Sequence, residues 1–196
     1  NLSQRYKGRI KAYEIWNEPA LADFMYPYDD KNRNKLAKMT KDASRIIKGN
    51  DPKALVGAAS VLPRDSSGGM KRSSRMFTAY AKQGKDWGGI DFVACHIYPE
   101  PGKGFKRFKD LYNEVKSSMK EHGCPVTKIW VTEAAYGLLA KDAIPDAKAE
   151  QLVKDTYEFI KKKNLYWYAW NRAADLGGFS ISHGSAGWDA IKRYGK

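Results

Sequence analysis

The chain has 196 residues, of which 42% are hydrophobic and 13% aromatic, so it can bury a core and is not a disordered tail. Two cysteines exclude a disulfide scaffold and a four-cysteine metal site. Thirty-five Lys and Arg against 22 Asp and Glu give a formal charge of +13. This charge fits a nucleic acid, an anionic cell-wall polymer or an anionic membrane surface, and it equally fits a solvated basic surface.

One pattern recurs along the chain: a short apolar run, a loop and an amphipathic stretch. In the fourth amphipathic stretch, Leu152, Val153, Tyr157 and Ile160 recur at helical spacing. Strands that alternate with helices predict an α/β fold with a parallel sheet, and no break in composition divides the chain into domains. The predicted strands are 10–16, 54–60, 90–98, 128–132 and 165–170, and the predicted helices are 31–48, 72–83, 104–122, 147–163 and 186–194.

Two α/β architectures can carry this pattern. A doubly wound sheet usually has a glycine-rich phosphate loop after its first strand, whereas here the first strand ends in Trp16-Asn17-Glu18-Pro19. A (β/α)8 barrel places its chemistry at the carboxyl ends of its strands. The unusual polar residues fall at those ends, which favours the barrel.

Two carboxylates end different predicted strands, Glu18 after the first and Glu133 after the fourth. Strand alternation places Val131 and Glu133 on one face of the fourth strand, and His96 and Tyr98 on one face of the third. Glycoside hydrolysis needs one protonated carboxyl, which donates to the leaving oxygen, and one ionised carboxylate, which attacks or activates water. The pair Glu18 and Glu133 therefore indicates a glycosidase.

The segment 13–19, Tyr-Glu-Ile-Trp-Asn-Glu-Pro, resembles the fourth-strand motif of the clan of retaining β-glycosidases with (β/α)8 barrels. The segment 129–133, Ile-Trp-Val-Thr-Glu, resembles the seventh-strand motif of that clan. The resemblance implies that Glu18 is the general acid/base, that Asn17 binds the 2-hydroxyl of the substrate and that Glu133 is the nucleophile. Retention requires about 5–5.5 Å between the two carboxyls, and we expect that spacing here.

Two further segments carry the same resemblance. His-Ile-Tyr-Pro at 96–99 is similar to the sixth-strand segment, which implies that His96 lines the sugar site and that Tyr98 contacts the nucleophile. Tyr-Ala-Trp-Asn at 168–171 is similar to the eighth-strand end, which implies that Trp170 is a stacking platform for the sugar. No cofactor or metal is implied, and the resemblance favours a secreted or extracellular location.

The resemblance begins at the fourth strand of the family barrel. It predicts that residues 1–196 form the C-terminal portion of such a catalytic domain, a partial barrel with strands four to eight, and that the first three β/α units are absent. Residues 1–8 are predicted to end the preceding helix. Because five strands leave the inner face of the sheet uncovered, we expect the chain to belong to a larger polypeptide or to be completed by another chain, for which a second copy is one candidate.

Alternatives remain open at the level of the sequence. Asn17-Glu18-Pro19 could be a strand-to-helix turn with an Asn cap, and His96 and Trp170 could be core residues. Trp16 and Trp130 are expected to pack in the interior, and Tyr136 could contact substrate or pack in the core. The expected partner is a carbohydrate, and an anionic or cell-wall polysaccharide is one candidate. The competing functions are a non-catalytic carbohydrate-binding fragment and a basic nucleic-acid-binding module, although no nucleic-acid-binding motif appears.

Overall fold

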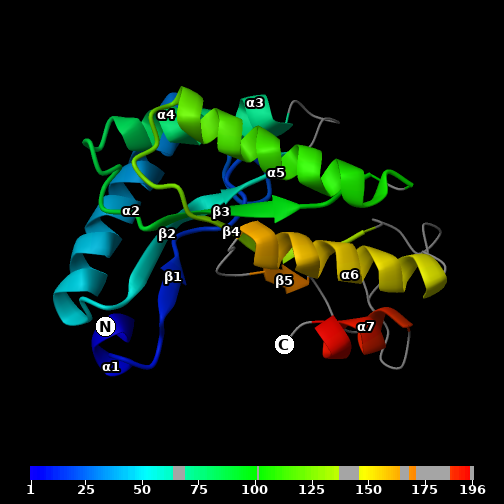
Figure 1. Ribbon diagram of the computed structural model, residues 1–196. Coiled ribbons are helices and arrows are strands. Elements are labelled where there is room, and N and C mark those ends of the chain that lie inside the picture. The colour runs from blue at the N-terminus through cyan, green and yellow to red at the C-terminus, as the bar shows by residue number, and fades with distance from the viewer. Residues whose placement is uncertain (64–68, 101, 137–145, 164–167, 171–185, 195–196) are drawn as a thin grey trace. The chain divides into compact units, whose positions relative to one another are not determined.

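The fold is an α/β fold with one parallel sheet, in which neighbouring strands are also consecutive in the sequence. The computed structural model describes residues 1–63, 69–100, 102–136, 146–163, 168–170 and 186–194. Five described strands form one sheet in the order β1-β2-β3-β4-β5 (Figure 1). A doubly wound sheet reverses its strand order near the middle, and this sheet does not. The fold is therefore the predicted partial (β/α)8 barrel.

The bounds of the elements agree closely with the sequence prediction. The predicted helix 72–83 is divided into two helices, and the first strand is shorter than predicted because the backbone of Trp16 turns into the left-handed region at φ 80°. The strands are β1 Ala12–Glu14, β2 Leu55–Val61, β3 Phe92–Ile97, β4 Ile129–Ala134 and β5 Tyr168–Trp170. The helices are α1 Leu2–Arg5, α2 Asp30–Asn50, α3 Gly69–Ser73, α4 Arg75–Ala81, α5 Gly104–Glu121, α6 Asp146–Lys163 and α7 Ala186–Tyr194.

The chain consists of two compact units. Unit 1 comprises Asn1–Cys95 and Glu114–Trp130, and unit 2 comprises His96–Asn113 and Val131–Lys196. The strands β3 and β4 each contribute residues to both units. Among the described residues, none of the helices combines the length and the apolar character needed to cross a membrane.

The core of unit 1 lies around β2 and β3. Ile47 of α2 packs with Ala54 and Val56, and Phe92 stacks on Trp130 with 3.9 Å between ring centroids. This stacking confirms the prediction that Trp130 is a packing residue. Gly57 of β2 lies directly against Phe92, because a Cβ atom built on Gly57 would overlap the Phe92 ring. Glycine in the middle of β2 therefore allows the close approach of this aromatic side chain.

One flank of α2 is bonded to the segment that leads into β3. Ser44 Oγ donates to the Gly89 carbonyl at 2.8 Å, and Lys48 Nζ forms an ion pair with Asp91 Oδ2 at 2.6 Å. The turn before Asp91 places Trp87 in the interior, where it is 2% exposed and lies 5.5 Å from the Phe77 ring. These contacts fix α2 along one side.

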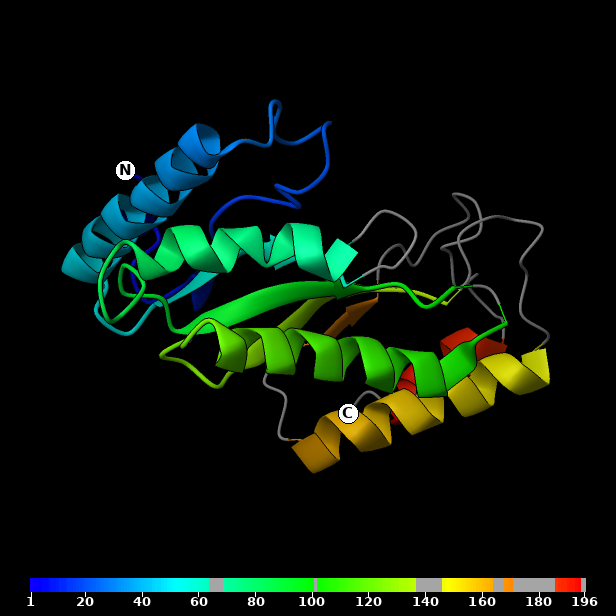
Figure 2. The same ribbon diagram turned by 90° about the horizontal axis from the view of Figure 1, so that it is seen from above.

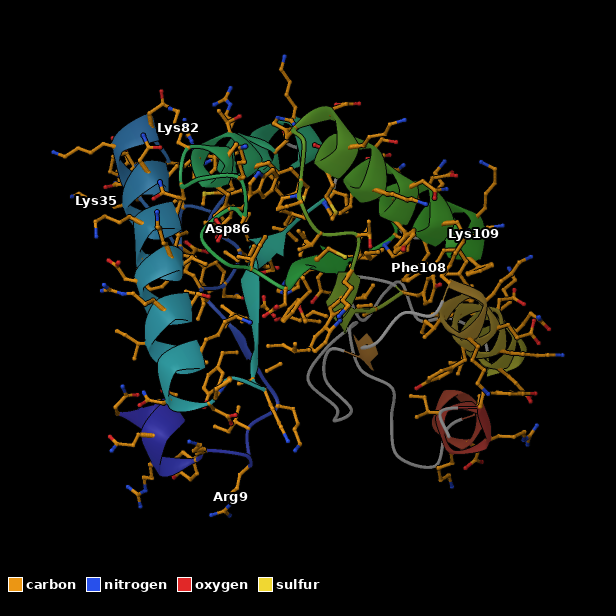
Figure 3. The ribbon with its side chains drawn as sticks, turned by 60° about the vertical axis from the view of Figure 1, so that its left-hand side comes forward. Arg9, Lys35, Lys82, Asp86, Phe108 and Lys109 are labelled. Atoms are coloured by element: carbon orange, nitrogen blue, oxygen red, sulfur yellow. The ribbon has the colours of Figure 1, made fainter. Side chains whose placement is uncertain are left out.

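Unit 2 has a separate aromatic core. Phe159 of α6 meets the rings of Phe108 and Tyr112 edge-on, at centroid distances of 6.0 and 5.2 Å. Tyr136 packs 6.1 Å from Phe108 and its hydroxyl lies 2.8 Å from Thr156 Oγ1. Of the two roles open to Tyr136, its position favours core packing, and burial raises the pKa of its phenol. Figure 2 shows α6 and α7 beside each other, and Figure 3 labels Phe108 on α5.

Candidate active site

The Asn-Glu-Pro segment of unit 1 lies at the carboxyl end of β1 and is tied to β2 by a serine. The Glu18 backbone N–H donates to Ser60 Oγ at 3.0 Å, and the Ser60 hydroxyl donates to Asn17 Oδ1 at 3.4 Å. Ser60 is 1% exposed and Glu18 is 8% exposed, so the bond between them is shielded from water. Ser60 thus positions both residues of the motif.

Ser60 is a site residue that the sequence motifs do not predict. The available signal was weak: a hydroxyl side chain in the otherwise apolar run Leu-Val-Gly-Ala-Ala-Ser-Val at 55–61. A buried polar side chain in a central strand needs a hydrogen-bond partner, and here that partner is the loop that follows the neighbouring strand. The carboxyl end of β2, which carries Ser60, therefore belongs to the candidate site.

The reading of Asn17-Glu18-Pro19 as a strand-to-helix turn is wrong. The following helix, α2, begins only at Asp30, and its N-cap is Asp29, whose carboxylate accepts from the Asn32 N–H at 2.8 Å. Glu18 instead has φ 39°, a left-handed backbone that an L-residue adopts at a cost of about 1–3 kcal/mol. Such strain persists where the surrounding structure fixes the residue, which is common at functional sites.

The prediction that Trp16 packs in the interior is also wrong. Its side chain is 48% exposed, although its indole Nε1–H donates to the Phe24 carbonyl at 3.1 Å. The left-handed backbone of Trp16 turns the residue out of the strand, so that strand alternation no longer decides which way its side chain points.

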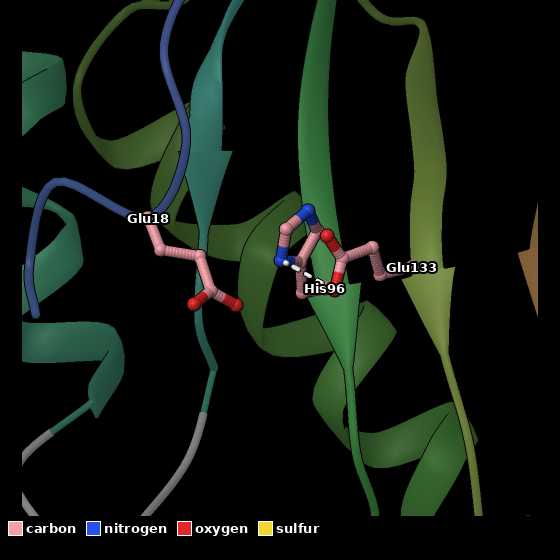
Figure 4. A group of neighbouring side chains, drawn as sticks. All are labelled: Glu18, His96 and Glu133. Atoms are coloured by element: carbon pink, nitrogen blue, oxygen red, sulfur yellow. Dashed lines mark ion pairs between the residues drawn. The ribbon is translucent and has the colours of Figure 1, made fainter. Parts of the chain in front are cut away.

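In unit 2, three predicted site residues meet at the ends of β3 and β4, and Figure 4 draws two of them, His96 and Glu133. Tyr98 Oη–H donates to Glu133 Oε2 at 2.5 Å, and His96 Nδ1 lies 3.6 Å from the same oxygen. The two rings are 6.4 Å apart and nearly perpendicular. The structure thus brings together Tyr98, His96 and Glu133 as the alternation of both strands predicts.

Two of these three side chains are buried, whereas the Glu133 carboxylate is partly exposed. His96 is 1% exposed and Tyr98 is 5% exposed, whereas one third of the Glu133 side chain remains accessible. A short O–H···O bond of this length is typical of a donor to an ionised acceptor. The buried pair therefore holds the orientation of a carboxylate that solvent or a ligand still reaches.

The remaining predicted site residue lies in β5. The backbone of Trp170 belongs to that strand, and Ala134 and Trp170 are partners in the parallel ladder. The side chain of Trp170, and the residues Asn171 and His183, lie outside the described residues. The predicted platform role of Trp170, and the expectation that no cofactor or metal takes part, stay predictions.

Comparison with known proteins identifies a family for this chain. Residues 15–182 match the family described as glycosyl hydrolase catalytic core. A beta-xylosidase from Geobacillus stearothermophilus is 27% identical over 108 residues, which is 55% of this chain and 19% of that protein. The chain thus spans about a fifth of the length of that relative.

Two solved structures share the fold at low identity. A glucosidase from Croceicoccus marinus superposes with a TM-score of 0.67 at 14% identity, over 94% of this chain and 39% of that one. A curdlan-specific exo-beta-1,3-glucanase from Blastomyces gilchristii gives 0.61 at 17% identity, over 93% and 69%. Since the family match extends over most of the sequence, the chain belongs to the glycosyl hydrolase catalytic core family.

Proposed function

We propose that the chain is the C-terminal part of the catalytic domain of a retaining glycoside hydrolase acting on a β-linked glycan. Glu18 is the acid/base and Glu133 is the nucleophile. The observation that carries the proposal is the 2.5 Å hydrogen bond from Tyr98 to Glu133 at the carboxyl ends of β3 and β4. A solvent-accessible carboxylate held by a buried phenol is what a nucleophile in this family needs.

The proposed reaction has two displacements. The Glu133 carboxylate attacks the anomeric carbon while the Glu18 carboxyl gives its proton to the leaving oxygen, so the glycosidic bond breaks and a glycosyl ester forms. Glu18, now ionised, takes a proton from a water molecule, which attacks the same carbon and releases Glu133. Asn17 binds the 2-hydroxyl, His96 lines the sugar site and Trp170 stacks on the ring.

The test compares the two carboxylates with leaving groups of different quality. Glu133→Ala abolishes turnover of every substrate, because no ester forms. Glu18→Ala keeps the first step for aryl glycosides with good leaving groups, which need little protonation, and azide restores their turnover by replacing the activated water. Glu158→Ala, an exposed position on α6, is the matched control and keeps full activity.

Three outcomes decide between the functions. Equal loss for all leaving groups in Glu18→Ala overturns its assignment as the acid. Inversion at the anomeric carbon, read by NMR of the first product, replaces retention and requires about 6.5–9.5 Å between the carboxyls. Glycan binding without turnover in the unmodified chain assigns it to the non-catalytic carbohydrate-binding class.

We also propose that β1 pairs with further structure, either from a longer polypeptide or from a second copy. β1 is an edge of the described sheet, and Leu2 and Ile46 of unit 1 are 67% and 46% exposed. An unpaired edge and exposed apolar side chains favour association. Light scattering measures the outcome: a monodisperse monomer with full glycosidase activity contradicts this proposal.

A further inference from the structure

Trp16 lines a hollow on unit 1 whose composition resembles a sugar-binding surface. The hollow has a volume of about 220 Å³ and is formed by the loop after β1 and the first turns of α2. Its apolar wall consists of Trp16, Met25, Leu36 and Met39, and its polar edge consists of Asn32 and Lys35. This volume lies below the range of about 300–1,000 Å³ that is typical of pockets for drug-sized ligands, so the hollow is restricted to a small group such as one sugar ring.

The aromatic wall is held in place before any ligand arrives. The Trp16 indole is bonded through Nε1 to the Phe24 carbonyl, while 48% of the side chain remains exposed. A fixed ring loses little conformational entropy when a ligand stacks on it. The C–H face of a sugar ring is apolar, and a flat indole offers the matching surface.

The polar edge supplies a hydrogen-bonding amide and a positive charge. Asn32 is anchored because its Nδ2 donates to the Pro27 carbonyl at 3.0 Å. Lys35 forms no hydrogen bond or ion pair with any described residue, and Figure 3 shows it projecting from α2. The ammonium group is therefore available for a ligand, and it favours a carboxylate.

From this hollow we infer a binding subsite for a sugar residue that carries a carboxylate, such as a uronic acid, on the leaving-group side of the cleaved bond. The assignment to the leaving-group side rests on the proposed function, in which Glu18 protonates the leaving oxygen. Trp16 precedes Glu18 by two residues, so their Cα atoms are at most about 7 Å apart. The charge of +13 on the whole chain favours the approach of an acidic glycan.

The experiment measures binding at the hollow, independently of turnover. Methyl β-D-glucuronide and methyl β-D-glucoside are titrated into the ¹⁵N-labelled chain, and the indole N–H signal of Trp16, assigned by its loss in Trp16→Phe, is followed by NMR. We expect the glucuronide to shift this signal and to bind about tenfold more tightly than the glucoside, a difference of about 1.4 kcal/mol.

The variants separate the two parts of the subsite. Lys35→Gln abolishes the preference for the glucuronide, whereas Lys31→Gln, an exposed lysine of the same helix outside the hollow, preserves it. Trp16→Ala and Met39→Gln weaken binding of both sugars about tenfold, measured by calorimetry, and Tyr26→Ala, an exposed aromatic outside the hollow, does not.

Each contrary result overturns a named claim. An indole signal that stays unchanged at tens of millimolar of either sugar, or a preference for the glucuronide that survives in Lys35→Gln, overturns the subsite whether or not the chain hydrolyses aryl glycosides. A chain that binds through Trp16 but hydrolyses nothing keeps the subsite and overturns the proposed function.

Discussion

Glu18 in unit 1 is positioned through its backbone, whereas Glu133 in unit 2 is positioned through its carboxylate. The Glu18 N–H is bonded to the buried Ser60 hydroxyl, and the Glu133 Oε2 atom accepts from Tyr98 and lies near His96. Under the proposed mechanism, the acid/base must gain and lose a proton, while the nucleophile must stay ionised until it attacks. A donor aimed at Glu133 suits the second task, and the bond to Ser60 fixes the backbone that carries the proposed acid/base.

The largest expected effect tests the unit 2 half of this comparison. Tyr98→Phe removes a hydrogen bond to a charged group, worth about 1.5–3 kcal/mol, so kcat/KM falls by about 10- to 150-fold. Tyr136→Phe is the matched control, because its hydroxyl is bonded to Thr156 in the core of the same unit. If both variants lose the same activity, the Tyr98 contact has no special role at Glu133.

Packing around β2 in unit 1 gives the next effect. Gly57→Ala places a methyl group against Phe92, which cannot retreat because it is stacked on Trp130. Overpacking of this kind costs about 1–3 kcal/mol of unfolding free energy, measured by urea denaturation. Gly49→Ala has no atom within 4 Å of its Cβ and lies in α2, so this control is expected to be stabilising. A stable Gly57→Ala protein would contradict the close packing of unit 1.

In unit 1, the backbone position of Glu18 depends on its hydrogen bond to Ser60. Ser60→Ala leaves the buried Glu18 N–H without its serine partner and costs about 1 kcal/mol, or about fivefold in kcat/KM. Under the proposed acid role of Glu18, the loss is greater for substrates with poor leaving groups. An equal loss for good and poor leaving groups would separate Ser60 from proton transfer. Ser74→Ala, whose hydroxyl is bonded to the Lys71 carbonyl at 3.1 Å, is the control.

The smallest effect concerns the acid stability of unit 1. The Gly8 N–H, 2.6 Å from Asp51 Oδ2, lowers the pKa of that carboxyl below its usual value. A lowered folded-state pKa gives stability that is present above about pH 3.9 and is lost as the pH falls through the folded-state value. Asp51→Asn is therefore less stable than the natural chain near pH 6, and the difference shrinks below about pH 4. Thermal melts at both pH values measure this difference.

The sequence predicted the regular parts of the fold because hydrophobic alternation and helical spacing are local signals. Strand parity placed Tyr98 on one face of the third strand and Glu133 on one face of the fourth, and the family resemblance implied the contact between them that the structure contains. The exposure of Trp16 could not be predicted in this way, because strand alternation no longer determines the direction of a side chain where the backbone enters the left-handed region.

Ser60 could not be assigned from sequence for a different reason. Its partner is the Glu18 backbone, 42 residues earlier, and a bond to a backbone N–H leaves no pattern in side-chain identities. The division of the predicted helix 72–83 is similar, because Ser73 is drawn into bonds with both the N–H and the carbonyl of Leu62. Contacts between segments far apart in the chain decided both outcomes.

The burial of Trp87 should protect the fluorescence of one of the six tryptophans from quenchers in solution. Trp87 is 2% exposed and enclosed by Phe77 and Tyr80, so its fluorescence should emit at short wavelength and resist quenching by iodide. Trp16, with half of its surface in water, should be quenched by the same ion. Iodide therefore suppresses the emission of the loop tryptophan and leaves that of the core, so that the opening of the interior of unit 1 becomes visible as a red shift of the protected emission.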